Sequence, residues 1–142
     1  DLDQLYETAR DHAELQYELA MAYVSLSRLQ RAPSQSNLGD AAGAAQSLAR
    51  GLELARRSLA LDPRLSKNRN LISAALAYQG DLLVLEGKVH EAIPYFEQSL
   101  EMARSVRFGE GAAARLALTP INKLAEAYEV IGKRDEALAL LQ

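Results

Sequence analysis

Histidines are the first side chains to consider for catalysis or metal binding. The chain has two, His12 and His90, and it has no cysteine, which excludes thiolate ligands, cysteine nucleophiles and disulfides. His90 is followed by Glu91 but lacks the second histidine of a zinc-protease motif, and His12 lies in the polar run ETARDHAEL. Both histidines are therefore predicted to lie on helix surfaces, and we expect no metal and no cofactor.

Two glycine-containing segments could be mistaken for phosphate-binding loops. FGEGAAAR, at residues 108–115, lacks a preceding strand, a third glycine and a Lys-Ser/Thr pair. GKRDE, at residues 132–136, carries Arg134 where a Walker motif needs a hydroxyl residue. Both segments predict helix-to-helix turns. No pair of carboxylates stands in a setting that predicts a shifted pKa, so we expect that the chain is not an enzyme.

The composition favours one folded, all-α unit. The 142 residues are 49% hydrophobic, 25% charged and only 6% aromatic, without Trp, and Ala and Leu dominate. A net charge of −3 gives no basic face for nucleic acid. No apolar stretch is long enough to span a bilayer, and the start DLDQLYETAR is no signal peptide. These features predict a soluble chain, with the cytoplasm as the default location.

A short pattern of glycine, alanine and a large apolar residue occurs three times, with gaps of five and then four residues. Asp or Lys follows each glycine, which is typical of a turn where one helix ends in a left-handed residue and the next begins. Small and large residues also recur three apart upstream of the turns, as in Gly80 and Leu83. The pattern therefore predicts helix pairs. The three copies are Gly39, Ala44 and Leu48; Gly87, Ala92 and Phe96; and Gly132, Ala137 and Leu141.

The helices expected from these turns alternate with short connections. The segment APSQSNL, at residues 32–38, contains turn and cap formers and predicts an enlarged first loop. Pro94 is expected near a first turn, and Pro120 leaves open whether the fifth helix begins or bends there. The predicted helices are 2–31, 41–61, 65–86, 89–107, 112–131 and 134–142.

These residues resemble the tetratricopeptide repeat family, in which small and large core residues, a turn glycine and a closing Pro recur; LALDP, at residues 59–63, fits that ending. The resemblance implies tandem helix-turn-helix repeats, about three helix pairs, in a right-handed α-superhelix. The turn glycines recur at a longer period than the usual 34 or so residues, so the helices are longer than usual. We expect repeat units at about 9–63, 64–107 and 108–142, within a fragment of a larger protein.

The family resemblance implies a protein-interaction module that binds a peptide or helix in its concave groove, which the first helix of each pair lines. We expect the groove to be mixed in character with an excess of acidic residues, and therefore to bind a ligand with apolar residues and some positive charge. The groove residues predicted to contact a partner are Tyr17, Met21, Tyr78, Asp81, Asn122, Glu126 and Glu129. Further groove-facing positions are Glu14, Val24, Ala74, Ala77, Val84 and Lys123.

A second interpretation is a self-assembling scaffold of a larger regulatory protein. Exposed ends of a repeat array can pair as a homodimer, and Ala139, Leu140 and Leu141 form such an end. The segment NLGDAAGAAQSLARGLELAR is similar to repeat regions appended to bacterial Ser/Thr kinases and regulators. Helical spacing assigns the following residues to the core: Leu19, Tyr23, Leu48, Leu83, Phe96, Leu100, Leu124, Tyr128 and Leu138.

Overall fold

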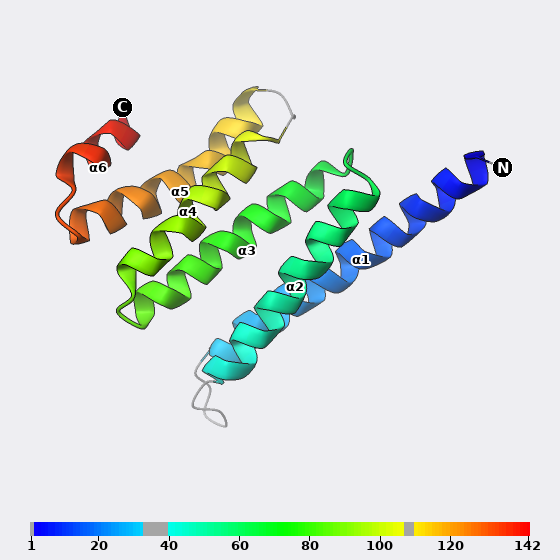
Figure 1. Ribbon diagram of the computed structural model, residues 1–142, viewed down its shortest axis with the longest axis horizontal. Coiled ribbons are helices and arrows are strands. Elements are labelled where there is room, and N and C mark those ends of the chain that lie inside the picture. The colour runs from blue at the N-terminus through cyan, green and yellow to red at the C-terminus, as the bar shows by residue number, and fades with distance from the viewer. Residues whose placement is uncertain (1, 33–39, 107–109) are drawn as a thin grey trace. The chain divides into compact units, whose positions relative to one another are not determined.

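The chain is all-α, as the sequence predicts. A computed structural model describes residues 2–32, 40–106 and 110–142, and within these ranges the chain forms six α-helices and no strand (Figure 1). The predicted helix limits agree with the observed ones to within about one turn. The helices are α1 (Leu2–Arg31), α2 (Ala41–Leu61), α3 (Ser66–Leu85), α4 (Val89–Arg104), α5 (Glu110–Val130) and α6 (Arg134–Leu141).

Some predicted features lie outside the described residues. These are most of the enlarged loop at 32–38, the turn glycine Gly39, and Phe108 and Gly109 of the glycine-containing segment. Just after the first gap, the Asp40 carboxylate accepts a hydrogen bond from the backbone N–H of Gly43 at 2.8 Å. This side-chain cap satisfies one of the free N–H groups in the first turn of α2, so Asp40 fixes where that helix begins.

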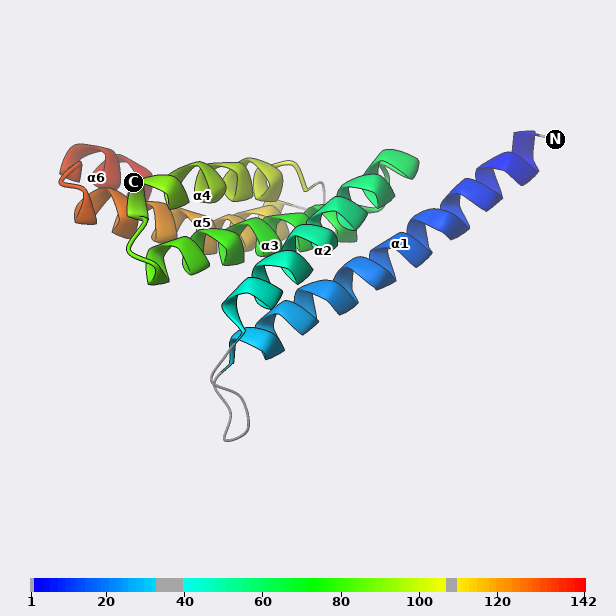
Figure 2. The same ribbon diagram turned by 60° about the horizontal axis from the view of Figure 1, so that its bottom comes forward.

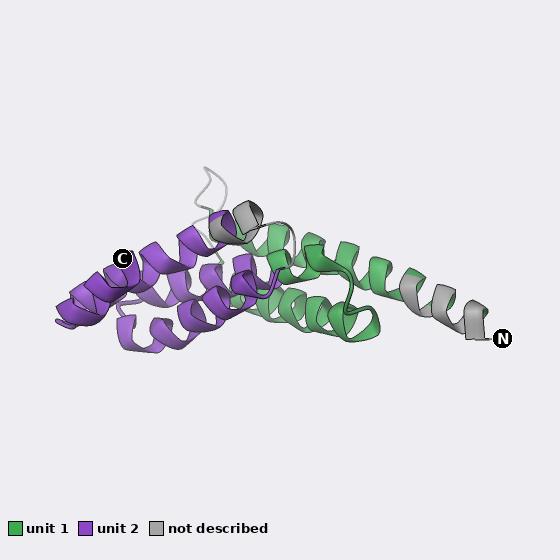
Figure 3. Ribbon diagram, turned by 90° about the horizontal axis from the view of Figure 1, so that it is seen from above, with its two compact units in different colours: residues 1–71 green, residues 72–142 purple. Residues whose placement is uncertain are grey.

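The chain divides into two compact units, which Figure 3 distinguishes by colour. Unit 1 is residues 1–71 and unit 2 is residues 72–142, so the boundary falls within α3. In unit 1, α1 packs along α2 (Figure 2). In unit 2, α5 packs against both α4 and α6.

Two of the predicted turn glycines have the left-handed backbone conformation that is predicted for them. Gly87 and Gly132 have φ of 79° and 82°, the left-handed region that glycine adopts without a Cβ clash. After each, an amide N–H reaches back to the helix: Lys88 N to the Leu83 carbonyl, and Lys133 N to the Tyr128 carbonyl, both at 2.8 Å. This is the Schellman pattern of helix termination, so α3 and α5 end at these glycines because of residue type.

Small residues let α1 and α2 pack closely in unit 1. Gly51 is buried, and a Cβ at this position would lie 2.9 Å from Val24 Cγ2. Ser27 Oγ donates to the Ala44 carbonyl at 2.6 Å, and Ser58 Oγ donates to the Ala13 carbonyl. The fully buried serines are therefore satisfied by the backbone of the facing helix, as buried hydroxyls require.

The core of unit 2 lies between α4 and α5. Leu83, Ile121 and Tyr128 pack against its edge while remaining partly exposed. Ser73 of α3 and Ser99 of α4 are both buried, and each donates a hydrogen bond to the other's carbonyl, at 2.9 and 2.8 Å. The buried residues of this core are Ala92, Phe96, Leu100, Ala103, Ala117, Leu124 and Ala127.

α5 continues through the buried Pro120, as in the predicted helix 112–131, so the alternative of a helix that begins at Pro120 is wrong. Pro94 is the sixth residue of α4, beyond the first turn, so it removes one intrahelical hydrogen bond that would otherwise form.

The predictions for two core residues and two groove residues are wrong. Leu19 and Leu138 are 44% and 51% exposed, whereas Val24 and Ala77 are buried. Spacing alone identified Leu19 as apolar on a helical face, but the face of α1 that packs on α2 is the one that carries Val24.

Candidate peptide-binding pocket on α3 and α5

Unit 2 contains a surface pocket of about 120 Å³ between α3, α4 and α5. Two of the predicted partner-binding residues, Asp81 and Glu126, line it, together with the predicted groove positions Val84 and Lys123. This volume is well below the roughly 300–1,000 Å³ of pockets that enclose a whole small-molecule ligand, so it suits a single side chain. The full lining is Asp81, Val84, Val89, Phe96, Lys123, Glu126, Ala127 and Val130.

The floor of this pocket is apolar and its rim is mixed. Phe96 and Ala127 are almost fully buried, and Val89 is half-buried. At the rim, Val84 and Val130 are 41% and 70% exposed, so part of the rim is apolar. An apolar group entering the pocket would remove both valines from water.

Charges at the pocket are partly paired. Lys123 Nζ of α5 lies 2.6 Å from Asp81 Oδ1 of α3, and both side chains are roughly one-third exposed. The predicted acidic groove includes Asp81, but this ion pair balances its charge. The negative charge left at the pocket is that of Glu126, which is exposed.

Two further predicted residues flank Glu126 along α5. Asn122 lies one turn before it and Glu129 one turn after it, and all three side chains are exposed. Neither Asn122 nor Glu129 lines the pocket. The exposed face of α5 therefore adds a polar strip, with two carboxylates, beside the apolar opening. Tyr78, on α3, is half-buried and also lies outside the pocket lining.

Two of the predicted groove residues of unit 1, Glu14 and Tyr17, contact Lys67. Lys67 Nζ lies 4.4 Å from the centroid of the Tyr17 ring and forms an ion pair with Glu14. The hydrogen bond to Glu14 is the main cause that raises the pKa of Lys67. Tyr17 is thus engaged by a cation of its own unit, whereas Met21, one turn further along α1, is 39% exposed.

Phe96 is the pocket residue whose role sequence reasoning missed. Its repeat position correctly placed it in the core, where it is 1% exposed. The same ring also lines the pocket. No sequence signal shows that a core ring also borders a surface pocket.

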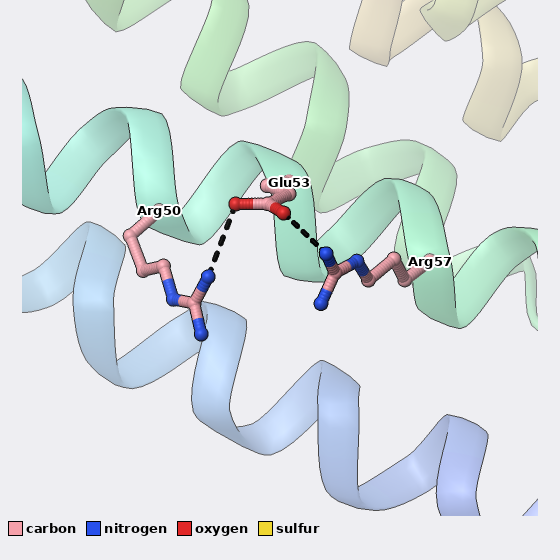
Figure 4. Close-up of polar contacts among 3 residues, drawn as sticks. All are labelled: Arg50, Glu53 and Arg57. Atoms are coloured by element: carbon pink, nitrogen blue, oxygen red, sulfur yellow. Dashed lines mark hydrogen bonds and ion pairs between the residues drawn. The ribbon is translucent and has the colours of Figure 1, made fainter.

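The basic run at residues 55–57 takes part in ordinary surface pairing. Glu53 on α2 accepts from Arg50 at 3.1 Å and from Arg57 at 2.5 Å, in the i,i+3 and i,i+4 spacings of a helix face (Figure 4). All three side chains are about half exposed, so water screens these pairs and each contributes little to stability. The arrangement is a solvated helix surface.

No helix among the described residues is both long and apolar enough to cross a membrane. No group of three or more His, Asp or Glu side chains in the same residues is placed to hold a metal ion.

Part of the chain is similar to a known protein family. Residues 75–106 match the family model of the tetratricopeptide repeat. This segment includes about the second half of α3 and all of α4, and therefore contains Asp81, Val84, Val89 and Phe96 of the pocket. No curated protein and no solved structure matches the chain.

Proposed function

Because this chain belongs to the tetratricopeptide repeat family through residues 75–106, we propose that its α3–α5 pocket binds a peptide or helix of a partner protein. Repeats of this family are in general non-catalytic protein-interaction modules. The observation that carries the proposal is the pocket itself, whose buried floor of Phe96 and Ala127 opens between two exposed valines. A partner would insert one apolar side chain there.

The charges beside the pocket determine which residues of the partner fit on either side of its apolar side chain, here called the anchor. The Asp81–Lys123 pair is electrically balanced, whereas Glu126 and Glu129 are exposed carboxylates on the same face of α5. A Lys or Arg about one helical turn from the anchor would meet them. Complementary charge of this kind speeds association and sets register more than it adds affinity. The proposed ligand is thus an apolar residue followed or preceded by a basic one.

The test begins with a random peptide library displayed on phage and selected against the chain. We expect the enriched peptides to combine a large apolar residue with Lys or Arg. The best peptide is then labelled, and its affinity is measured by fluorescence polarisation for the chain and for a Glu126→Lys, Glu129→Lys variant. The charge reversal should weaken binding severalfold or more, most strongly at low salt.

A matched control separates the pocket from overall charge. Glu91→Lys with Glu101→Lys makes the same change in net charge on exposed residues of α4, and it should leave the affinity nearly unchanged. A second variant, Val84→Gln with Val130→Gln, removes only the apolar rim and should also weaken binding. Peptides that bind all four proteins equally would contradict the proposed site, provided that circular dichroism shows each variant to be folded.

A further inference from the structure

The α3–α5 pocket is smaller than the space that an aromatic side chain needs. A closed apolar cavity of about 150 Å³ holds one benzene ring, whereas the volume of this pocket is about 120 Å³. The methylene group that joins a phenyl or indole ring to its backbone needs further room. A leucine or isoleucine side chain is smaller than a phenyl ring with its methylene, so the volume favours an aliphatic group.

Phe96 limits the depth of the pocket because its ring has no free space on the α3 side. Three atoms of the ring lie within 2.8 Å of the position that a Cβ would take at Gly80, so the ring already occupies the space beside the α3 backbone. The Phe96 side chain is 1% exposed and belongs to the core between α4 and α5. Close-packed cores contain few voids larger than a water molecule, so the ring does not move aside for a larger group.

Three valines limit the width of the pocket: Val84 of α3, Val89 of α4 and Val130 of α5. A β-branched side chain in a helix strongly prefers one χ1 rotamer, so these walls are stiff. On the floor, Ala127 is buried and has no side-chain torsion to adjust. The apolar part of the pocket is therefore preformed, and its size is set before a partner binds.

We propose that this pocket selects an aliphatic anchor, Leu or Ile, over Phe, Tyr or Trp, and that Phe96 is the residue that sets the size limit. The inference rests on the proposed function, because it concerns the anchor of the same partner peptide. One methylene more or fewer in an apolar pocket changes selectivity by roughly 10–200-fold. The partner segment therefore combines an aliphatic anchor with a Lys or Arg about one helical turn away.

Methyl NMR with two amino-acid amides tests the size limit without a partner peptide. The alanine and valine methyl groups of the chain are isotope-labelled, and N-acetyl-leucinamide or N-acetyl-phenylalaninamide is added at millimolar concentrations. The leucine probe should shift the methyl signals of Val84, Val130 and Ala127 in a saturable way. Its affinity should exceed that of the phenylalanine probe at least about tenfold.

The other two outcomes of this titration contradict different claims. Equal affinities for the two probes would overturn the size limit and leave the pocket as a site for an apolar anchor. If neither probe shifts these methyl signals, the pocket accepts no anchor, and the proposed function fails together with the size limit.

Two core variants test whether Phe96 sets the limit. Phe96→Leu removes ring atoms from the pocket lining, so the preference for the leucine probe should fall to severalfold or less. Leu124→Ala is the matched control, because Leu124 is 2% exposed in the same core and does not line the pocket. It should keep the preference of the wild type. If both variants change the preference equally, a general loosening of the core would replace Phe96 as the cause.

A second pair of variants avoids the core, in case Phe96→Leu does not fold. Val84→Ala with Val130→Ala widens the pocket at two exposed positions, and alanine is the better helix former, so the protein should fold and the preference should fall. Leu85→Ala with Leu118→Ala is the control, since both leucines are exposed on the same two helices but lie outside the lining. It should retain the preference. An unchanged preference in the widened pocket would overturn the proposal.

Discussion

Gly80 of α3 lies directly against the ring of Phe96 of α4. A Cβ at position 80 would come within 2.4 Å of Phe96 Cε1, with two further ring atoms inside 2.8 Å. Real Cβ atoms do not approach other heavy atoms so closely. The Phe96 ring therefore occupies the space that a side chain at position 80 would need, so the large residue on α4 requires glycine on α3.

This relationship predicts that Gly80→Ala destabilises the protein. Alanine in a helix interior is ordinarily better than glycine by about 1 kcal/mol, so stabilisation would be the default expectation. Overpacking against Phe96 should reverse the sign, with a net loss of about 1–3 kcal/mol in the free energy of unfolding. Urea denaturation followed by circular dichroism measures the change.

A double variant provides the control for this prediction. Phe96→Leu removes the ring atoms that a Cβ at position 80 would meet. It costs stability itself, but adding Gly80→Ala to it should then cost much less than in the wild type. If the losses in the free energy of unfolding from the two single variants simply add in the double variant, contact with the Phe96 ring is not the cause of the Gly80→Ala loss.

Gly87→Ala should destabilise the protein for a different reason. No atom lies within 4 Å of a Cβ built at Gly87, but its φ of 79° belongs to the left-handed region. The expected loss is about 1–2 kcal/mol by chemical denaturation. Gly87→Asn should lose less, because asparagine tolerates this region, and Phe96→Leu should not rescue Gly87→Ala. Equal losses for Ala and Asn would argue against a backbone origin.

Helix limits were predictable from the sequence because the residues that end and begin helices act locally. Gly87 and Gly132 terminate helices whatever surrounds them, and Asp40 caps α2 by reaching only three residues ahead. The all-α class follows from the same local signals. The recurrence of Ala92 and Phe96 also identified core positions, since both are buried.

Side-chain partners across helices were not predictable in the same way. Asp81 and Lys123 are 42 residues apart, and their pairing depends on how α3 and α5 approach each other. Helical spacing predicts Leu19 in the core because it shows that a face is apolar, but α1 has two apolar faces and spacing does not say which one packs on α2. These outcomes are decided by tertiary packing.

Neutralising Asp81 and neutralising Lys123 should change the affinity for a basic peptide in opposite directions. Asp81→Asn leaves Lys123 unbalanced at the pocket and should weaken the binding of a basic peptide. Lys123→Gln leaves Asp81 unbalanced and should strengthen it. Because both side chains are partly exposed, either change should alter the free energy of unfolding by only about 0.2–1 kcal/mol.

Fluorescence polarisation with the selected peptide at low and high salt measures both affinities. The difference between the two variants should shrink as salt rises, since exposed charges are screened. Affinities that change in the same direction in both variants would mean that the pair supports the pocket's shape rather than its charge.

Tyr128 predicts the behaviour of the protein at alkaline pH. Its hydroxyl donates to Glu97 Oε1 at 2.9 Å, and burial, this hydrogen bond and the charges of Glu97 and Glu136 raise the pKa of the phenol above its usual 10.0. A group whose pKa is higher in the folded state contributes stability that is fully present below its unfolded pKa and is lost as pH rises through the folded value.

The free energy of unfolding should therefore fall more steeply above pH 10 in the wild type than in a Tyr128→Phe variant. The difference in phenolate absorbance between the two proteins isolates the titration of Tyr128, which should lie above that of an ordinary tyrosine. Glu97→Gln should lower the pKa of Tyr128. The variant loses the carboxylate that accepts the hydrogen bond of the neutral phenol and whose negative charge disfavours the phenolate. A Tyr128 titration that does not respond to Glu97→Gln would leave burial as the sole cause, whereas parallel stability curves for the wild type and Tyr128→Phe would contradict the linkage itself.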